Sequence, residues 1–310
     1  MTTIGFLGFG EAGSTIARGL RTRGMTDIVA YDIAQETSQL VQRRAQEGDV
    51  RLVDDPSALA AAADVIVSAV VCTQASAAAG SIADHLGERH WYLDINSVAP
   101  GVKHAIAASL EPRGVDYVDV AVMDNATDDF DRLPLRLAGT RVDAVIDQVF
   151  ADVGFHATPV SATPGEAARI KMFRSLFVKG LEALSLEAML ACYPTGVHER
   201  VLESFEASFG GYTFPELVKH LIERHAIHGE RRGTELEEVA GALREVGVDP
   251  IMAEAGYERM RWDVDRGLQK RFVGGDDPDW LEVLEVLTAL PEEPTGGPAS
   301  GPASEPTDER

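Results

Sequence analysis

Three glycines near the start of the chain have the spacing that a bound dinucleotide requires. They follow the apolar run 4–7 and are Gly8, Gly10 and Gly13. The first permits a tight turn out of a strand, the second lets the backbone approach a pyrophosphate, and the third lets the next helix pack closely on the strand. The amino end of that helix then faces the phosphates. We expect the residues between the glycines to line the same site, namely Phe9, Glu11 and Ala12.

An acidic residue completes this motif. The second apolar run, 28–31, ends in Asp32, nineteen residues after Gly13. A carboxylate at this distance holds the ribose diol and repels a 2′-phosphate, and the following Ile33, Ala34 and Gln35 supply no cation to receive one. The pattern therefore predicts NAD as the cofactor, with NADP less favoured. The alternative is a flavodoxin-like sheet in which the glycines are incidental.

The elements that must position these residues alternate along the first half of the chain. Strand-like apolar runs occur at 3–8, 27–32, 50–53, 64–71, 91–95, 117–122, 135–139 and 155–159. Helical stretches between most of them predict an α/β, doubly wound, mostly parallel Rossmann sheet with its ligand crevice at the carboxyl ends of the strands. Val70 and Val71 end the fourth run, so we expect both to contact the cofactor. The segment 117–139 has no clear crossover helix and predicts a mixed or antiparallel edge.

A long helix follows the last strand. Thr163, Pro164 and Glu166 form a helix-start signal, and no proline interrupts the sequence until Pro194. Beyond it the pattern is helical only, and Thr234 with Glu237 predicts another helix start for the segment 234–246. The predicted organisation is a dinucleotide-binding Rossmann domain (1–162), an interdomain helix (163–193), an all-helical substrate and dimerisation domain (194–290) and a disordered acidic tail (291–310).

The composition restricts the class of partner. Of 310 residues, 50 are acidic and 28 are Lys or Arg, and the net charge of −22 opposes binding to nucleic acid or to an anionic membrane. Cys72 and Cys192 show no metal-ligand spacing, so we expect no metal site and a reducing, cytoplasmic location. The uncharged stretch 65–83 contains several Ser, Thr, Gln and Gly residues, which favours a buried strand and helix over a membrane span.

This order of elements resembles the β-hydroxyacid dehydrogenase superfamily, which includes 3-hydroxyisobutyrate and 6-phosphogluconate dehydrogenases. The glycine turn at 8–13 is similar to the superfamily's first turn. The loop 94–100 (Asp-Ile-Asn-Ser-Val-Ala-Pro) resembles its loop beside the nicotinamide, and the spacing from Gly165 to Lys171 matches that of its catalytic lysine. The resemblance implies Lys171 and Ser97 as catalytic residues and Asn96 as a substrate contact. The stretches Ile-Lys-Met-x-Arg-Ser (170–175) and His-x-x-Arg-Arg (228–232) resemble a phosphogluconate-dehydrogenase-like branch with its own type of C-terminal domain.

Each of these roles has a simpler alternative. Lys171 has two interpretations. At an interdomain cleft it can donate or accept the hydroxyl proton during hydride transfer, and otherwise it is a solvated lysine on a helix surface. Ser97 either binds a substrate oxygen or caps the helix that begins after Pro100. We expect Asp94 to have a structural role.

The chain departs from the superfamily at two places. Members usually have Ser-Gly-Gly after the sixth strand, where backbone amides hold a substrate carboxylate, and this chain has Met123, Asp124 and Asn125 there. The resemblance implies that these three residues contact the substrate, and whether they bind a carboxylate stays open. The superfamily's asparagine three residues after the lysine is replaced by Arg174, next to Ser175. Arg174 and Ser175 share a helix face with Lys171, and we expect both to contact the substrate. Arg174 either binds a substrate carboxylate or forms a surface ion pair.

In related dimers the helical domain of one subunit reaches the cleft of the other. This implies a homodimer in which His228 and Arg232 contact the substrate, the alternative being a solvated basic face.

Together, the nucleotide motif and the resemblance predict an NAD-dependent oxidoreductase for the alcohol or carbonyl of a small, polar, anionic hydroxy acid. Alternatives are an imine or biosynthetic ketone reductase and a non-catalytic nucleotide-sensing protein.

Overall fold

The computed structural model describes residues 2–123, 133–150, 157–272 and 278–289. The backbone contacts divide the chain into two compact units, Met1–Val178 and Lys179–Arg310. We call them the α/β unit and the helical unit, and each is described by itself. The predicted tail, 291–310, lies outside the described residues.

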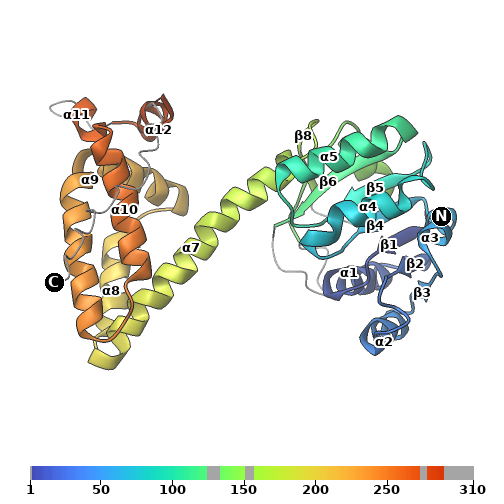
Figure 1. Ribbon diagram of the computed structural model, residues 1–310, viewed down its shortest axis with the longest axis horizontal. Coiled ribbons are helices and arrows are strands. Elements are labelled where there is room, and N and C mark those ends of the chain that lie inside the picture. The colour runs from blue at the N-terminus through green and yellow to red at the C-terminus, as the bar shows by residue number, and fades with distance from the viewer. Residues whose placement is uncertain (1, 124–132, 151–156, 273–277, 290–310) are drawn as a thin grey trace, which may run out of the picture. The chain divides into compact units, whose positions relative to one another are not determined.

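The α/β unit is built on one eight-stranded sheet (Figure 1). Every strand-like run of the sequence forms a strand, and the strands are β1 (Ile4–Leu7), β2 (Ile28–Tyr31), β3 (Arg51–Leu52), β4 (Val65–Ser68), β5 (Trp91–Asp94), β6 (Asp116–Val122), β7 (Leu135–Ala138) and β8 (Ala157–Ser161). Their order is β3-β2-β1-β4-β5-β6-β7-β8. The first six strands are parallel, so the predicted doubly wound Rossmann sheet is confirmed.

The far edge of the sheet reverses direction. Strand β7 pairs antiparallel with β6, with Val120 opposite Leu137, and β8 runs parallel to β7. The antiparallel edge predicted for the segment 117–139 is therefore confirmed. The sequence between these strands shows no crossover helix, and parallel neighbours need a long crossover connection.

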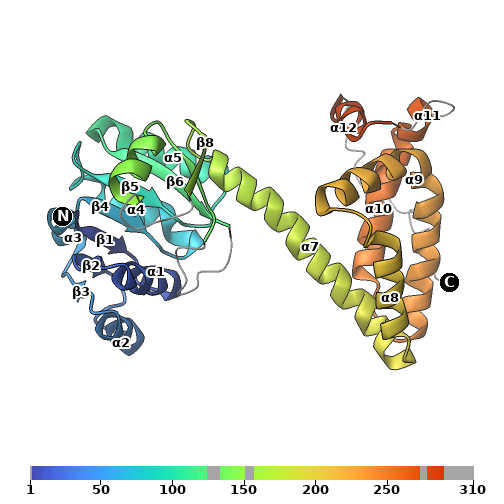
Figure 2. The ribbon, with the colours of Figure 1, turned by 180° about the vertical axis from the view of Figure 1, so that it is seen from behind.

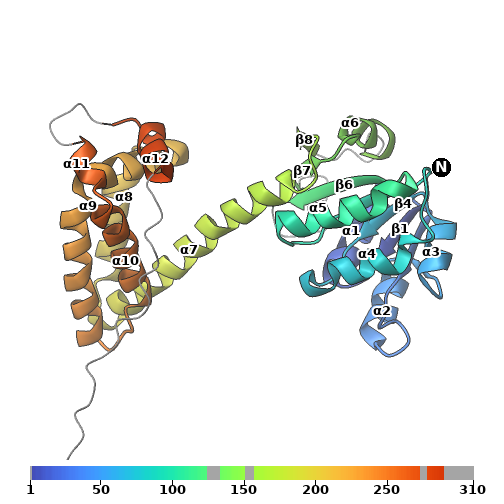
Figure 3. The same cartoon turned by 45° about the horizontal axis from the view of Figure 1, so that its top comes forward.

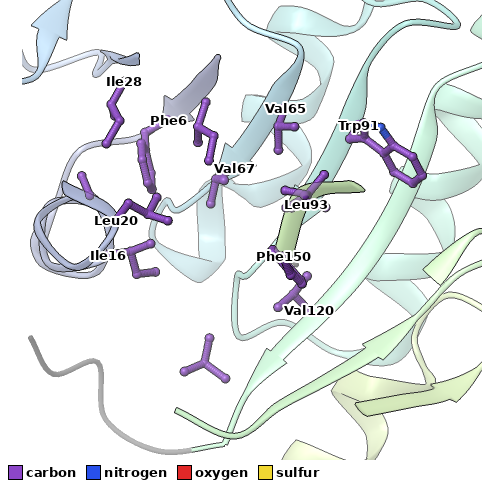
Figure 4. Packing of buried hydrophobic residues seen from close by; sticks show 14 of the residues in the cluster. Phe6, Ile16, Leu20, Ile28, Val65, Val67, Trp91, Leu93, Val120 and Phe150 are labelled. Carbon is purple, nitrogen blue, oxygen red and sulfur yellow. The ribbon is translucent and has the colours of Figure 1, made fainter. Parts of the chain in front are cut away.

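Helices cover both faces of this sheet (Figure 3). One face is covered by α1 (Glu11–Thr22), α2 (Gln39–Glu47) and α6 (Val142–Val145), and the other by α3 (Pro56–Ala62), α4 (Ala75–Ala83) and α5 (Pro100–Leu110). The described part of the unit also contains short helical turns at Cys72–Gln74 and Glu111–Arg113 and the π-helical Ile146–Phe150. Phe6, Leu20 and Val67 pack in the first of the two cores (Figure 4). The parallel strands are apolar on both faces because both faces are covered.

Helix α7 (Glu166–Thr195) begins in the α/β unit and continues into the helical unit. It starts just after Gly165, whose φ of +98° stops the helix from extending further back. Pro194 lies in the last turn, so the predicted length of the helix is right to within about three residues at each end.

The helical unit continues with α8 (His198–Phe209), α9 (Phe214–Glu245), α10 (Ile251–Asp265), α11 (Leu268–Phe272) and α12 (Trp280–Ala289) (Figure 2). The helix start predicted at Thr234 is wrong, because α9 runs through it without a break. The Thr234 hydroxyl donates to the Glu230 carbonyl inside the helix, and Thr213 with Glu216 forms the capping box that begins α9. No helix in the described ranges is both long and apolar enough to cross a membrane.

Candidate active site

A pocket lies where the strand order of the sheet reverses, between β1 and β4. Its volume is about 470 Å³, and the ends of β1, β2 and β4 with the start of α1 form its walls. Seven of the nine predicted cofactor residues line it, namely Gly8, Gly10, Glu11, Ala12, Asp32, Val70 and Val71. The reversal point of a doubly wound sheet is where such folds bind nucleotides.

The glycines beside this pocket have the geometry of a dinucleotide-binding turn. Gly8 has a φ of +92°, and a Cβ atom there would lie 2.6 Å from the Ala69 carbonyl oxygen. A Cβ atom on Gly13 would lie 2.7 Å from the Gly8 carbonyl oxygen, so the helix can pack this closely on the strand only if residue 13 is glycine. Gly10 has no atom within 4 Å of its Cβ position, which leaves the backbone open to a ligand. Gly13 thus shapes the turn and does not line the pocket.

Backbone amides hold the Asp32 carboxylate at the pocket wall. Its Oδ2 accepts a hydrogen bond from the Phe9 amide at 2.7 Å, and its Oδ1 accepts one from the Ala34 amide at 2.9 Å. Phe9 contributes this amide, while its ring is fully buried against Phe6 and is not part of the pocket lining. A carboxylate fixed in this way is ready to accept the two hydroxyls of a ribose.

Asn96 connects the pocket wall to the next strand. Its Oδ1 accepts from the Val70 amide at 2.7 Å, and its Nδ2 donates to Asp94 Oδ1 at 2.7 Å and to Ser68 Oγ at 2.9 Å. The side chain is buried, and both its Oδ1 and its Nδ2 bond groups of the protein, so the structure shows Asn96 linking the pocket wall to Asp94. The neighbouring Ser97 is exposed. Helix α5 has Ala99 at its N-cap and no side-chain cap, so Ser97 does not cap it.

A lysine that the sequence analysis did not single out lies at the centre of this region. Lys103 on α5 is 1% exposed, and its Nζ lies 2.9 Å from Asp94 Oδ1 and 3.3 Å from Asp119 Oδ1. The same ammonium donates to the Asp94 carbonyl oxygen at 2.6 Å, and the Tyr117 hydroxyl donates to Asp94 Oδ2 at 2.9 Å. The structural role expected of Asp94 is thus observed. One cation joins the carboxylates of two adjacent strands.

Asp119 also bonds the start of helix α7. Its Oδ2 accepts from the Gly165 amide at 3.1 Å and from the Ala168 amide at 2.9 Å. These amides belong to the start of the helix, where backbone N–H groups lack partners within the helix and the dipole favours a negative charge. Asp119 therefore acts as a buried cap for the helix that carries Lys171.

The electrostatics of this cluster follow from its burial. Burial raises the pKa of the Asp119 carboxyl, while the Lys103 ammonium and the Ala168 amide act in the opposite direction. Burial also raises the pKa of the Tyr117 hydroxyl, and the charges of Asp94 and Asp119 raise it further. Tyr117 therefore remains protonated and serves Asp94 as a hydrogen-bond donor.

Lys171 lies on α7 one turn after Ala168 and is half-buried. Gly165 packs against Pro100, since a Cβ atom on Gly165 would lie 2.8 Å from the Pro100 carbonyl oxygen. The segment of Ser97 and the helix of Lys171 therefore meet at this contact. Arg174 is exposed and Ser175 is half-buried, one turn further along α7.

The remaining predicted residues lie apart from this arrangement or outside the description. Met123 packs against the small cluster of Ala121, Ala138 and Ala167, whereas Asp124 and Asn125 lie outside the described residues. His228 and Arg232 are half-buried on α9 of the helical unit. Among the described residues, no group of three or more His, Cys, Asp or Glu side chains could hold a metal ion.

Two signals in the sequence point to the residues that the analysis missed. Lys103 shares its helix stripe with the buried Ile106 and Leu110, and a lysine on an apolar stripe needs a buried partner. Asp119 interrupts a run of apolar residues in a strand that is buried on both faces. Neither signal identifies the other partner, because the two residues come from different elements.

Comparison with known proteins agrees with this geometry. Residues 3–127 match the NAD binding domain of 6-phosphogluconate dehydrogenase, and residues 194–262 match a domain of unknown function, DUF1932. A conserved hypothetical protein from Sinorhizobium meliloti is 32% identical, over 93% of this chain and 96% of that one, with a TM-score of 0.56. The conserved protein MTH1747, described as structurally similar to 3-hydroxyacid dehydrogenases, is 28% identical over 86% of this chain and 98% of its own, with a TM-score of 0.57.

The chain belongs to the β-hydroxyacid dehydrogenase superfamily. Within that superfamily it has the phosphogluconate-dehydrogenase-like nucleotide domain followed by the DUF1932 domain, and it is an NAD(P)-binding member of a dehydrogenase and reductase family. The superfamily fold also extends to imine reductases. The enzyme from Myxococcus stipitatus, a V8 variant in complex with NAD+, matches 93% of this chain and 99% of its own with a TM-score of 0.70 at 17% identity. The same enzyme is also known in complex with NADP+.

Proposed function

We propose that this protein is an NAD-dependent oxidoreductase that transfers a hydride between nicotinamide and the alcohol or carbonyl group of a small, polar, anionic hydroxy acid. One observation carries the proposal. A cofactor-sized pocket, with Asp32 on its wall, is connected by buried hydrogen bonds and ion pairs to the helix of Lys171. Bound nicotinamide would supply the hydride chemistry, while the protein supplies binding, orientation and proton transfer.

The preference for NAD rests on the charges of the pocket. Asp32 and Glu11 line it, and none of its described lining residues is basic. A 2′-phosphate next to Asp32 would meet a fixed carboxylate without a cation to compensate it, whereas the ribose hydroxyls of NAD would find an acceptor. The start of α1 lines the pocket, and the backbone N–H groups at a helix start favour a pyrophosphate there.

Lys171 is proposed as the group that moves the proton. Its ammonium can protonate the oxygen of a carbonyl as hydride arrives, or its neutral amine can accept the proton of an alcohol as hydride leaves. Ser97, exposed on the loop before α5, is proposed to hydrogen-bond the same oxygen. Arg174, on the face of Lys171, offers two parallel N–H donors to a substrate carboxylate.

A second candidate is the reduction of an imine. The fold shared with imine reductases favours it, as does the replacement of the superfamily's Ser-Gly-Gly at positions 123–125. The same Lys171 would then lie near the substrate nitrogen. If the chain instead senses nucleotides without turnover, it binds NADH and reduces nothing.

We propose further that the protein acts as a homodimer through its helical unit. The last turns of α7 and helix α8 present large apolar side chains to solvent, among them Leu186 (61% exposed), Tyr193 (73%) and Phe205 (44%). Exposed apolar surfaces of this kind are typical of association sites, which supports the proposed homodimer. In such a dimer His228 and Arg232 of the helical unit would contact the substrate bound by the partner.

The test is an absorbance assay of NADH and NADPH oxidation, and of the reverse reaction, with a matched panel. The panel holds small hydroxy acids with their oxo acids, the corresponding neutral alcohols and ketones, and cyclic imines. Faster turnover of the anionic pair with NAD than of every other class supports the proposal. A preference for imines selects the second candidate, and tight NADH binding without turnover of any class selects the sensor.

A further inference from the structure

The α/β unit buries a cluster of charged side chains that takes no direct part in the chemistry proposed above. Lys103 is 1% exposed, and both carboxylates beside it are fully buried. Removing such a cluster from water is costly, and apolar residues of similar volume often stabilise a protein as well or better. Stability alone therefore does not explain why the interior contains this charged cluster. A need to fix the positions of α5, β5 and β6 relative to one another does explain it.

The cluster forms a continuous path between two parts of the site. It starts at the Val70 amide in the pocket wall, which donates to Asn96, and Asn96 donates in turn to Asp94. Lys103 then joins Asp94 to Asp119. We call these four residues the Lys103 network, namely Asn96, Asp94, Lys103 and Asp119.

The path ends at the helix of Lys171. Asp119 Oδ2 accepts the amides of Gly165 and Ala168, 46 and 49 residues away in the chain. Ala168 lies three residues before Lys171, which is about 4.5 Å along a helix axis. Charge-assisted hydrogen bonds of this type are about twice as strong as neutral ones, so Asp119 is suited to hold that turn in place.

We infer that the Lys103 network sets the position of Lys171 relative to the cofactor pocket, with Asp119 as the positioning residue that acts on helix α7. The inference rests on the proposed function in one respect, the role of Lys171 in proton transfer. Asp119 itself touches neither cofactor nor substrate in this assignment. Its effect reaches the reaction through the first turn of α7.

The decisive variant is Asp119→Asn, which keeps an oxygen acceptor for the helix amides and removes the charge that pairs with Lys103. Its matched control is Asp116→Asn, a carboxylate of the same strand that pairs with Arg141 and not with the cluster. Both are made in the full-length protein, alone and combined with Lys171→Met. The measurements are amide exchange in the segment 163–172, NADH affinity, kcat and KM.

For Asp119→Asn we expect amide exchange in 163–172 to rise about tenfold or more, because a neutral amide oxygen holds the Gly165 and Ala168 amides less strongly than a carboxylate does. NADH affinity should stay within about twofold. The kcat should fall about 10- to 100-fold with little change in KM, since a misplacement of about 1 Å costs up to 100-fold in rate. In the Lys171→Met background the further loss should be below about twofold, because two residues that act through one step are not additive. Asp116→Asn should change none of these quantities.

The outcomes separate the inference from the proposed function. Unchanged exchange in Asp119→Asn overturns the inference, as does an equal loss of kcat in both backgrounds, which would mean a general structural role. If Lys171→Met alone retains turnover, the proposed function is wrong, and the exchange measurement still decides whether Asp119 anchors α7. If Asp119→Asn does not fold, Gly165→Ala displaces the same turn from the Pro100 side and should give the same pattern of exchange and kcat.

Discussion

The two units of this protein bury their apolar side chains to different degrees. The α/β unit encloses a core on each face of its sheet, with Phe6 and Tyr92 among its fully buried side chains. The helical unit has a small cluster around Ala226, Leu268 and Val283, and its long helices leave many large apolar residues exposed. A sheet covered on both faces buries its apolar side chains within one unit. Long helices whose apolar side chains stay exposed can bury them only against a further surface. The candidate site therefore lies in the unit with the complete core, and the proposed homodimer would cover the exposed apolar side chains of the other unit.

In both units, nevertheless, a buried carboxylate accepts backbone amides at the start of a helix. Asp119 of the sheet accepts two amides at the start of α7. Glu187, further along α7, accepts the amides of Met252 and Ala253 at the start of α10, at 2.7 and 3.0 Å. Buried carboxylates thus fix helix starts in each unit, although only Asp119 belongs to a network that reaches a ligand pocket. The comparison can be tested by changes that should affect one unit and spare the other.

The largest effect should come from Lys171→Met in the α/β unit. The variant retains much of the side-chain length and removes the proton donor, so hydride transfer should fall about 100- to 10,000-fold while NADH still binds. Rapid-reaction kinetics and NADH titration measure both quantities. Turnover within tenfold of the parent, in a variant with an unchanged melting temperature, would show that Lys171 is an ordinary helix residue.

Lys103→Met should produce the largest loss of stability. It leaves the carboxylates of Asp94 and Asp119 buried without their cation, a change that typically costs about 3–5 kcal/mol. Lys179→Met, at an exposed position of α7 in the helical unit, should change the free energy of unfolding by less than about 0.5 kcal/mol. Denaturant titration of both variants tests the difference. Equal losses would contradict the view that the α/β unit is specified by its interior.

Tyr193→Ala should weaken association without destabilising the protomer. Tyr193 is 73% exposed, and a buried interface tyrosine is commonly worth about 2 kcal/mol, or roughly a 30-fold rise in the dimer dissociation constant. The control is Leu40→Ala, a half-exposed position on α2 of the α/β unit. Light scattering over a dilution series measures the effect. A monomeric parent protein would refute the proposed dimer directly.

Arg232→Ala sharpens the comparison further, because it asks whether the helical unit contributes to substrate binding. If the partner's α9 reaches the site, KM should rise about tenfold or more, since charge-assisted hydrogen bonds contribute about 1.5–3 kcal/mol. The melting temperature should change little. A parallel loss of stability and affinity would favour an ordinary structural ion pair.

The smallest expected effect is on cofactor choice. Asp32→Ala removes the acceptor for the ribose diol and the repulsion of a 2′-phosphate, so the ratio of kcat/KM for NAD over NADP should fall about tenfold. The change also removes the hydrogen bonds that Asp32 accepts from the Phe9 and Ala34 amides, so the melting temperature is measured beside the kinetic ratio. A parent protein that already prefers NADP would overturn the assignment.

The sequence predicts the α/β unit well because its signals are local. The strand-like runs, the glycine turn and the acid at Asp32 each lie within a few residues of the element they define. The Lys103 network was not predicted, since its partners come from α5, β5, β6 and α7 and meet only in the folded sheet. At Thr234 a local capping pattern gave the wrong helix start. The long helix α9 passes through it, and Gly233 is buried beside Met260 of α10.

The contact between Gly165 and Pro100 has a consequence for recombining this protein with its relatives. A chimera joined between the last strand and α7 would combine a Pro100 from one parent with a Gly165 from the other, and any side chain at position 165 would collide with the carbonyl oxygen 2.8 Å away. It would also separate the parent that supplies Asp119 from the helix turn that Asp119 binds. A crossover near residue 178, inside the helix, keeps both pairs together. Hybrid proteins that exchange the helical unit should therefore be joined within α7.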